Sequence, residues 1–272
     1  MGFVLSVSVV LLLAGAYVCV AFTGHVRAYF PKARYWAAAA LLAALTACFI
    51  LGALLPVSGF ARALYRIGGV YMGFLLYAFL FCLAGTVVLA ILKRLRRVSF
   101  PQARRVTAAV VTAGILLTCG YGFVHAANPK TAEYALHTEK ALPGGALTVV
   151  LISDLHLGYG RGAGLLRRAV ERINALEPDV VCIAGDLFDS GMERVFDLDA
   201  CAQALSELRS TYGVYACLGN HDRAQEHPEE FLERAGVTLL ADEAAAPGDA
   251  LYVVGRQDAR VDGRKSIPEL TG

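Results

Sequence analysis

Long apolar runs alternate with short polar segments over the first 127 residues of the chain. Four of these runs contain no charged residue, and each has about the 20 residues that a helix needs to cross a bilayer. Because backbone amides in lipid must be paired within their own segment, the runs are predicted to be helices. The predicted spans cover residues 3–22, 36–57, 68–92 and 106–124.

Other interpretations of a single run are a buried core helix or, for the first run, a cleaved signal peptide. Four runs in series, separated by short basic loops, favour a membrane region over a set of core helices. The first run has no basic residues before it and no clear small-x-small cleavage site after it. It is therefore predicted to be a retained anchor.

The charges divide the chain into two parts. Residues 1–127 carry 11 Lys and Arg and no acid, whereas the remainder carries 14 Lys and Arg against 23 acids. The mid-span positions hold no charged residue, which argues against a transporter. The predicted organisation is a transmembrane region at 1–127, a linker at 128–145 and a globular domain at 146–272.

Loop charge predicts the orientation of the spans. The segments 23–35 and 93–105 together contain nine Lys and Arg, whereas 58–67 contains two. Since basic loops stay preferentially in the cytoplasm, the globular domain is predicted to be extracytoplasmic. Contact with anionic lipid head groups is a second interpretation of the basic segment 93–105, and a topology signal alone is the simpler one.

The globular part alternates short apolar runs with amphipathic segments. This alternation predicts an α/β domain with a parallel sheet. The predicted strands are 147–153, 179–185, 213–219, 237–240 and 251–255, and the predicted helices are 164–177, 193–210 and 228–235.

Polar residues follow each of the first three predicted strands. Asp154 and His156 follow the first strand, Asp186 follows the second, and Asn220 and His221 follow the third. Because ligands gather beyond the carboxyl ends of parallel strands, these side chains are expected to converge at one edge. The sequence therefore predicts a metal site there.

The donor types indicate which metals and which chemistry to expect. Carboxylate with neutral imidazole suits Mn, Fe or Zn better than Ca or Mg. A carboxylate such as Asp186 can bridge two cations, and His221 is placed to donate a proton. Two divalent cations can activate water and stabilise an in-line displacement at phosphorus.

Three motifs in this order resemble the calcineurin-like metallophosphoesterases, in particular a membrane-anchored branch: DLH at 154–156, GDLFD at 185–189 and GNHD at 219–222. The resemblance implies an α/β layered two-sheet sandwich and two divalent metal ions. It implies that Asp154 and His156 bind the first metal, that Asp186 bridges, and that Asn220 binds the second. His221 would protonate the leaving group or hold the phosphate. Asp189 and Asp222 would support the ligands or simply be turn acids.

The sequence departs from the family pattern after the third motif. The family supplies a further His and a G-H-x-H motif, whereas the only His after His221 here is His227, which is expected on the surface. The domain is therefore predicted to be C-terminally incomplete, with one metal held well, little turnover and an exposed sheet edge.

The predicted function is that of a membrane-anchored metallophosphoesterase acting on a phosphomonoester or phosphodiester. A position next to the bilayer favours a lipid-linked or envelope substrate, and a protein phosphatase would differ only in its substrate. No nucleic-acid partner is expected, because the C-terminal half is acidic. The alternative is a non-catalytic binding or assembly protein with a degenerate phosphoesterase domain.

Overall fold

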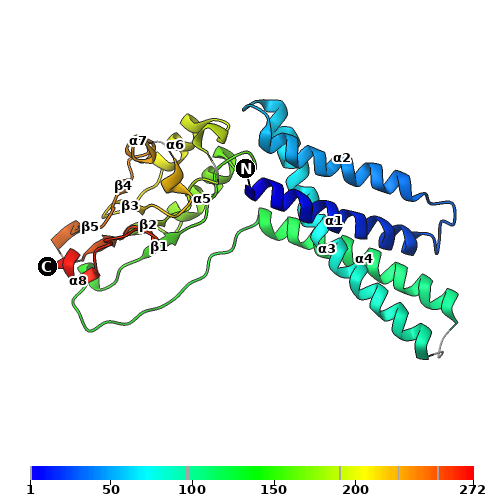
Figure 1. Cartoon of the computed structure of the whole chain (residues 1–272). Helices are drawn as coiled ribbons and strands as arrows, with labels where there is room; N and C mark the ends of the chain where they lie inside the picture. Colours follow the sequence, from blue (N-terminus) through cyan, green and yellow to red (C-terminus); the bar gives the residue numbers. More distant parts are fainter. Residues whose placement is uncertain (1, 96–98, 190, 226, 250) are drawn as a thin grey trace. The chain divides into compact units, whose positions relative to one another are not determined.

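A computed structural model describes residues 2–95, 99–189, 191–225, 227–249 and 251–272 (Figure 1). The chain divides into two compact units, residues 1–134 and 135–272. Each unit is described by itself.

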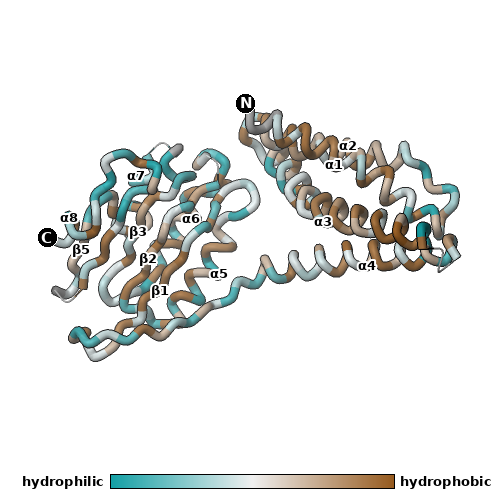
Figure 2. The backbone as a smooth tube through the Cα atoms, turned by 60° about the horizontal axis from the view of Figure 1, so that its bottom comes forward, coloured by the Kyte–Doolittle hydropathy of each residue, from teal (hydrophilic) through white to brown (hydrophobic). Residues whose placement is uncertain are grey.

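The N-terminal unit consists of four long helices in its described part. Their bounds are α1 Gly2–Val26, α2 Tyr35–Leu54, α3 Gly59–Leu95 and α4 Phe100–Ala127. All four are long and apolar enough to cross a membrane, and Figure 2 shows hydrophobic residues along them. The prediction of four membrane helices is confirmed. The second helix ends three residues earlier than predicted because Pro56 disfavours helical backbone before it.

Helix α3 begins nine residues before the apolar run that predicted it. Arg62 and Arg66 interrupt the hydrophobic pattern, although both lie within the helix. At 1.5 Å per residue its 37 residues extend about 55 Å, more than a hydrocarbon core of about 30 Å. Long basic side chains can therefore reach the polar surface while the backbone stays helical.

Helix α3 packs against its neighbours along one stripe. Tyr71, Leu75, Ala78 and Cys82 are all at most 3% exposed and recur at helical spacing. Close approach to α2 depends on Gly68, where a Cβ atom would lie 2.5 Å from the backbone nitrogen of Phe49. Small residues at such positions let membrane helices pack tightly.

The C-terminal unit contains a four-stranded parallel sheet in the order β1-β2-β3-β4. This confirms the predicted parallel α/β layering. The strands are β1 Val149–Ile152, β2 Val180–Ala184, β3 Val214–Cys217 and β4 Thr238–Leu239, and the helices between them are α5 Ala163–Asn174, α6 Leu198–Ser206 and α7 Pro228–Arg234. Residues 129–142, which precede the sheet, form no helix or strand.

The core lies between the sheet and these helices. Val181 and Ile183 of β2 pack in one buried cluster with Leu166 of α5 and Phe231 of α7. Strand β1 lies at the edge of the sheet and is less buried than β2, because its Leu151 side chain is 67% exposed. A sheet edge with an exposed apolar side chain was expected from the sequence.

The last part of the chain contains the predicted strand at 251–255, observed as β6 (Val253–Gly255), and two elements that the sequence analysis left out, β5 (Glu243–Ala245) and α8 (Ile267–Thr271). Strand β5 pairs antiparallel with β6, and the short helix α8 follows. Ser266 and Glu269 form a reciprocal capping box at the start of α8.

Candidate metal centre

The loops after β1 and β2 run side by side beyond the carboxyl edge of the sheet. The backbone N–H of Asp154 donates to the carbonyl of Gly185 at 3.2 Å, and that of His156 donates to the carbonyl of Asp186 at 3.0 Å. Further along, Leu157 N–H donates to Leu187 at 2.7 Å. These bonds fix the first two motifs against each other.

Two groups of potential metal ligands result. Asp154, His156 and Asp186 form the first group, and His156, Asp189 and His221 form the second. Within each group the ligand atoms lie within 4.8 Å of one another. His156 belongs to both groups, so the two lie next to each other.

The imidazole of His156 fits a cation ligand. Its Nε2 lies 3.8 Å from a carboxylate oxygen of Asp154, whereas its Nδ1 is buried without a hydrogen-bond partner among the described residues. Buried polar atoms are almost always partnered. With the proton on Nε2, the lone pair on Nδ1 is available to a metal, so this donor set fits a divalent cation.

The backbone at three of these residues is left-handed. The φ angles are 56° at Asp154, 46° at His156 and 52° at Asp186. Asp and His are among the few residues enriched in this region, and such conformations cluster at functional sites.

Two glycines allow the second and third motifs to meet. A Cβ atom at Gly185, where φ is 76°, would lie 2.6 Å from the nitrogen of Gly219. A Cβ atom at Gly219 would lie 2.5 Å from the nitrogen of Asp186 and would also collide with its carboxylate. Neither position accepts a side chain without moving Asp186 or its support.

His221 is held by the second motif. Its backbone N–H donates to Oδ1 of Asp186 at 3.0 Å, and its Nδ1 lies 2.7 Å from the carbonyl oxygen of Asp189. Its ring lies edge-on to that of His156, with the ring centroids 5.0 Å apart. The structure thus brings His221 to the same edge as Asp154, His156 and Asp186.

Asp222 is a buried connector between two loops. Its side chain is 1% exposed, and its two oxygens accept hydrogen bonds from the N–H groups of Phe188 at 2.9 Å and Gly219 at 3.0 Å. The sequence left two interpretations of Asp222, and the structure favours support of the ligand loops over an ordinary turn acid.

Burial raises the pKa of the nearby Cys217 thiol, and the charge of Asp222 raises it further, so Cys217 stays neutral.

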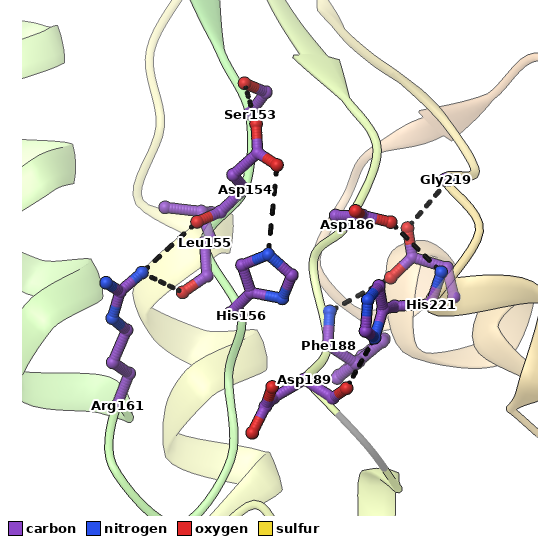
Figure 3. Close-up of polar contacts among 11 residues, drawn as sticks. Ser153, Asp154, Leu155, His156, Arg161, Asp186, Phe188, Asp189, Gly219 and His221 are labelled. Atoms are coloured by element: carbon purple, nitrogen blue, oxygen red, sulfur yellow. Dashed lines mark hydrogen bonds and ion pairs between the residues drawn. The ribbon is translucent and has the colours of Figure 1, made fainter. Parts of the chain in front are cut away.

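The loop of the first motif has its own polar supports. The hydroxyl of Ser153 donates to Oδ2 of Asp154 at 2.5 Å. Arg161 donates to the carbonyl oxygens of Asp154 at 3.3 Å and Leu155 at 3.4 Å. Figure 3 shows these contacts beside the ligand groups.

Two further residues were considered as ligands in the sequence analysis. Asn220 is exposed in the turn between Gly219 and His221, and its role as a ligand stays a prediction. His227 is exposed, and its Nδ1 contacts Glu229 at 3.1 Å. The sequence analysis interpreted Asp189 as a support of the ligands or a turn acid, whereas its carboxylate belongs to a group of potential ligands. Its place at the end of GDLFD, beyond the same strand as Asp186, was the available signal.

A parallel α/β sheet that gathers carboxylates and imidazoles beyond its carboxyl edge forms a candidate metal site. Residues 147–259 match the family described as calcineurin-like phosphoesterase. The resemblance predicted from the three motifs is therefore confirmed.

Several curated proteins are similar to the chain. A "Transmembrane protein with metallophosphoesterase domain" from Danio rerio is 35% identical over 181 residues, covering 63% of this chain and 40% of that protein. An "Uncharacterized metallophosphoesterase" from Aquifex aeolicus is 31% identical and covers 50% of this chain and 51% of its own length. "Phosphodiesterase YaeI" from Escherichia coli is 28% identical and covers 57% of this chain and 61% of its own length.

The chain thus spans 40% to 61% of the length of these relatives. The share of this chain aligned with the Danio rerio protein exceeds what residues 147–272 provide, so that similarity extends upstream of the family match. No solved structure matches the chain.

Proposed function

We propose that this chain is a membrane-anchored phosphoesterase that hydrolyses a phosphomonoester or phosphodiester at a dinuclear metal centre. The observation that carries the proposal is the pair of adjacent ligand groups that share His156. One group alone would suit a single structural or catalytic cation. Since His156 offers one lone pair and can serve only one cation, a second cation would draw on the carboxylates of Asp186 and Asp189, one from each group.

The donor types favour Mn, Fe or Zn. Asp154, His156 and Asp186 would hold the first cation, Asp186 would also face the second, and Asn220 would complete that side. When bound, two such cations would activate water and would stabilise the attacking and leaving oxygens of a displacement at phosphorus. Asp189 lies within reach of the second position and adds a carboxylate that the sequence analysis did not count.

His221 is the residue proposed to move a proton. Because the carbonyl of Asp189 can only accept, the contact at 2.7 Å places a proton on Nδ1. Nε2 then faces away from that contact, and in the doubly protonated ring it would carry the second proton and give it to the leaving oxygen. General acid catalysis of this kind contributes roughly 10²–10⁴-fold.

The membrane helices support a substrate close to a bilayer, and a lipid-linked or envelope phosphoester fits this placement. The loop charges favour an extracytoplasmic domain. The acidic composition of the C-terminal part argues against a nucleic-acid partner.

The test uses the purified full chain and its Asp186→Asn variant. After dialysis the native chain is expected to retain one divalent cation, and excess Mn²⁺ is expected to restore hydrolysis of bis(p-nitrophenyl) phosphate. The variant should lose metal and most activity, because the exchanged carboxylate faces both cation positions. A native chain that binds Mn²⁺ and hydrolyses no phosphoester supports the non-catalytic alternative. Full activity in Asp186→Asn contradicts the dinuclear proposal.

A further inference from the structure

An apolar groove of about 490 Å³ lies between α3 and α4 in the membrane unit. Small residues line the groove, including Ala84 and Ala103, and at its floor Gly85 packs closely against Val111 of α4. The larger side chains along its walls are Phe81, Val88 and Leu92 on α3 and Val106 and Val110 on α4.

The groove matches the depth of one lipid leaflet. Its α3 wall runs from Phe81 to Leu92, which at 1.5 Å per residue is about 16 Å along the helix. Half of a hydrocarbon core of about 30 Å has the same depth. Leu92 is three residues from the end of α3, so the groove reaches the membrane surface at that end.

The groove is open toward the surrounding bilayer. Val88, Val106 and Val110 line it and are 45%, 57% and 62% exposed. An extended hydrocarbon chain can therefore enter from the side and contact both helices without any backbone rearrangement. Such contacts are dispersive, so they favour binding of a hydrocarbon chain but do not discriminate between lipid head groups.

The surface end of the groove is strongly basic. Lys93 and Arg94 lie in the last turn of α3, and Arg104 and Arg105 lie near the start of α4. Residues 1–132 contain no Asp or Glu, so no acid within the four helices or the segments between them can neutralise these cations. Arg104 donates to the carbonyl of Gly24 at 2.6 Å, and Lys93 lies over the Phe100 ring with its Nζ 5.8 Å from the ring centroid. Neither contact supplies a full negative charge, so these cations can still face an anion.

We infer that the groove and its basic rim bind a glycerophospholipid with an anionic head group. One acyl chain lies between α3 and α4, and the phosphate faces Lys93 and Arg94. Basic pockets between membrane helices recognise anionic head groups in this way, and each surface cation contributes about fivefold in association. The inference depends on the membrane helices and not on the phosphoesterase activity.

The head-group part is tested with the full chain in phosphatidylcholine bilayers that contain spin-labelled phosphatidylglycerol or spin-labelled phosphatidylcholine. The native chain should immobilise phosphatidylglycerol preferentially. Lys93→Gln/Arg94→Gln should lower this preference by at least fivefold and at most about thirtyfold, the product of two surface cations. The matched control Arg62→Gln/Arg66→Gln removes the same charge at the other end of α3 and should retain the preference. Equal loss in both doubles indicates general attraction and overturns the inference.

The acyl-chain part is tested by filling the groove. Ala84→Phe should reduce the immobilised phosphatidylglycerol, whereas Ala109→Phe on an exposed, non-lining position of α4 should not. Helical circular dichroism and elution volume establish that each variant is folded, and Val110→Phe replaces Ala84→Phe if the latter is not. Unchanged lipid binding in a folded groove-filling variant overturns the inference.

Discussion

The Nδ1 atom of His221 lies 2.7 Å from the backbone carbonyl oxygen of Asp189. This contact joins the loop after β3 to the loop after β2 and fixes the imidazole tautomer, because a carbonyl oxygen only accepts. The ring is therefore positioned by backbone and not by a second titrating group. Its free nitrogen, Nε2, is the one available for chemistry.

Replacing His221 by Ala should lower phosphodiester turnover by about 10²–10⁴-fold, the usual contribution of a positioned acid. Metal content should stay largely unchanged, since its proposed role is proton transfer. Parallel measurements of turnover and bound metal check this. His227→Ala, at the exposed His outside both ligand groups, is the control and should behave as the native chain. A loss of one metal equivalent in His221→Ala would make His221 a ligand.

Gly219→Ala should disturb the metal centre without removing a ligand. The added Cβ would lie 2.5 Å from the nitrogen of Asp186 and would push its carboxylate away. We expect reduced metal affinity and reduced turnover, measured by titration with Mn²⁺. The control is Gly160→Ala in the first motif's loop, where a Cβ meets nothing within 4 Å. Native metal affinity in Gly219→Ala would show that the loop adapts.

Asp222→Ala should destabilise the C-terminal unit. The change leaves the buried N–H groups of Phe188 and Gly219 without an acceptor, and each such group costs about 1–3 kcal/mol. Thermal unfolding of the full chain measures the loss. Asp199→Ala is a useful contrast, because it removes an exposed pair with Arg234, which is worth about 0–1 kcal/mol. Equal stabilities of the two variants would contradict the connector role.

A reporter that is active only in the cytoplasm should be silent when it is fused after Lys140 and active when it is inserted between α3 and α4. The reason is the excess of Lys and Arg in segments 23–35 and 93–105. Activity after Lys140 would invert the orientation and place the candidate metal centre among cytosolic substrates.

Much of the fold follows from local patterns, and the exceptions have physical reasons. Charge-free runs of bilayer length located the four helices, and apolar runs that end in glycine located β2 and β3. The hydrophobic pattern missed the early start of α3, because Arg62 and Arg66 interrupt the apolar run. The aliphatic parts of their side chains are compatible with a helix whose charged ends reach the polar surface. It missed β5, since Glu243–Ala245 contains no β-branched or aromatic residue and is a strand only through its pairing with β6.

The candidate site was predictable in position and less so in detail. The order of motifs after parallel strands placed Asp154, Asp186 and His221 at one edge. The proximity of Asp189 to His156 and His221 depends on loop conformation, which no periodicity encodes. The burial of Asp222 depends on hydrogen bonds between loops that lie 34 residues apart in sequence.

The left-handed backbone at Asp154 and Asp186 restricts which amino acids these loops can accept during evolution or in a mutational library. Glutamate carries the same carboxylate, but a residue other than Gly, Asn or Asp costs roughly 1–2 kcal/mol in that conformation. Alanine would remove the ligand and strain the chain at once, so its effect has two causes. Asparagine adopts the left-handed conformation without added strain and removes only the charge, so this substitution isolates the electrostatic contribution of each carboxylate.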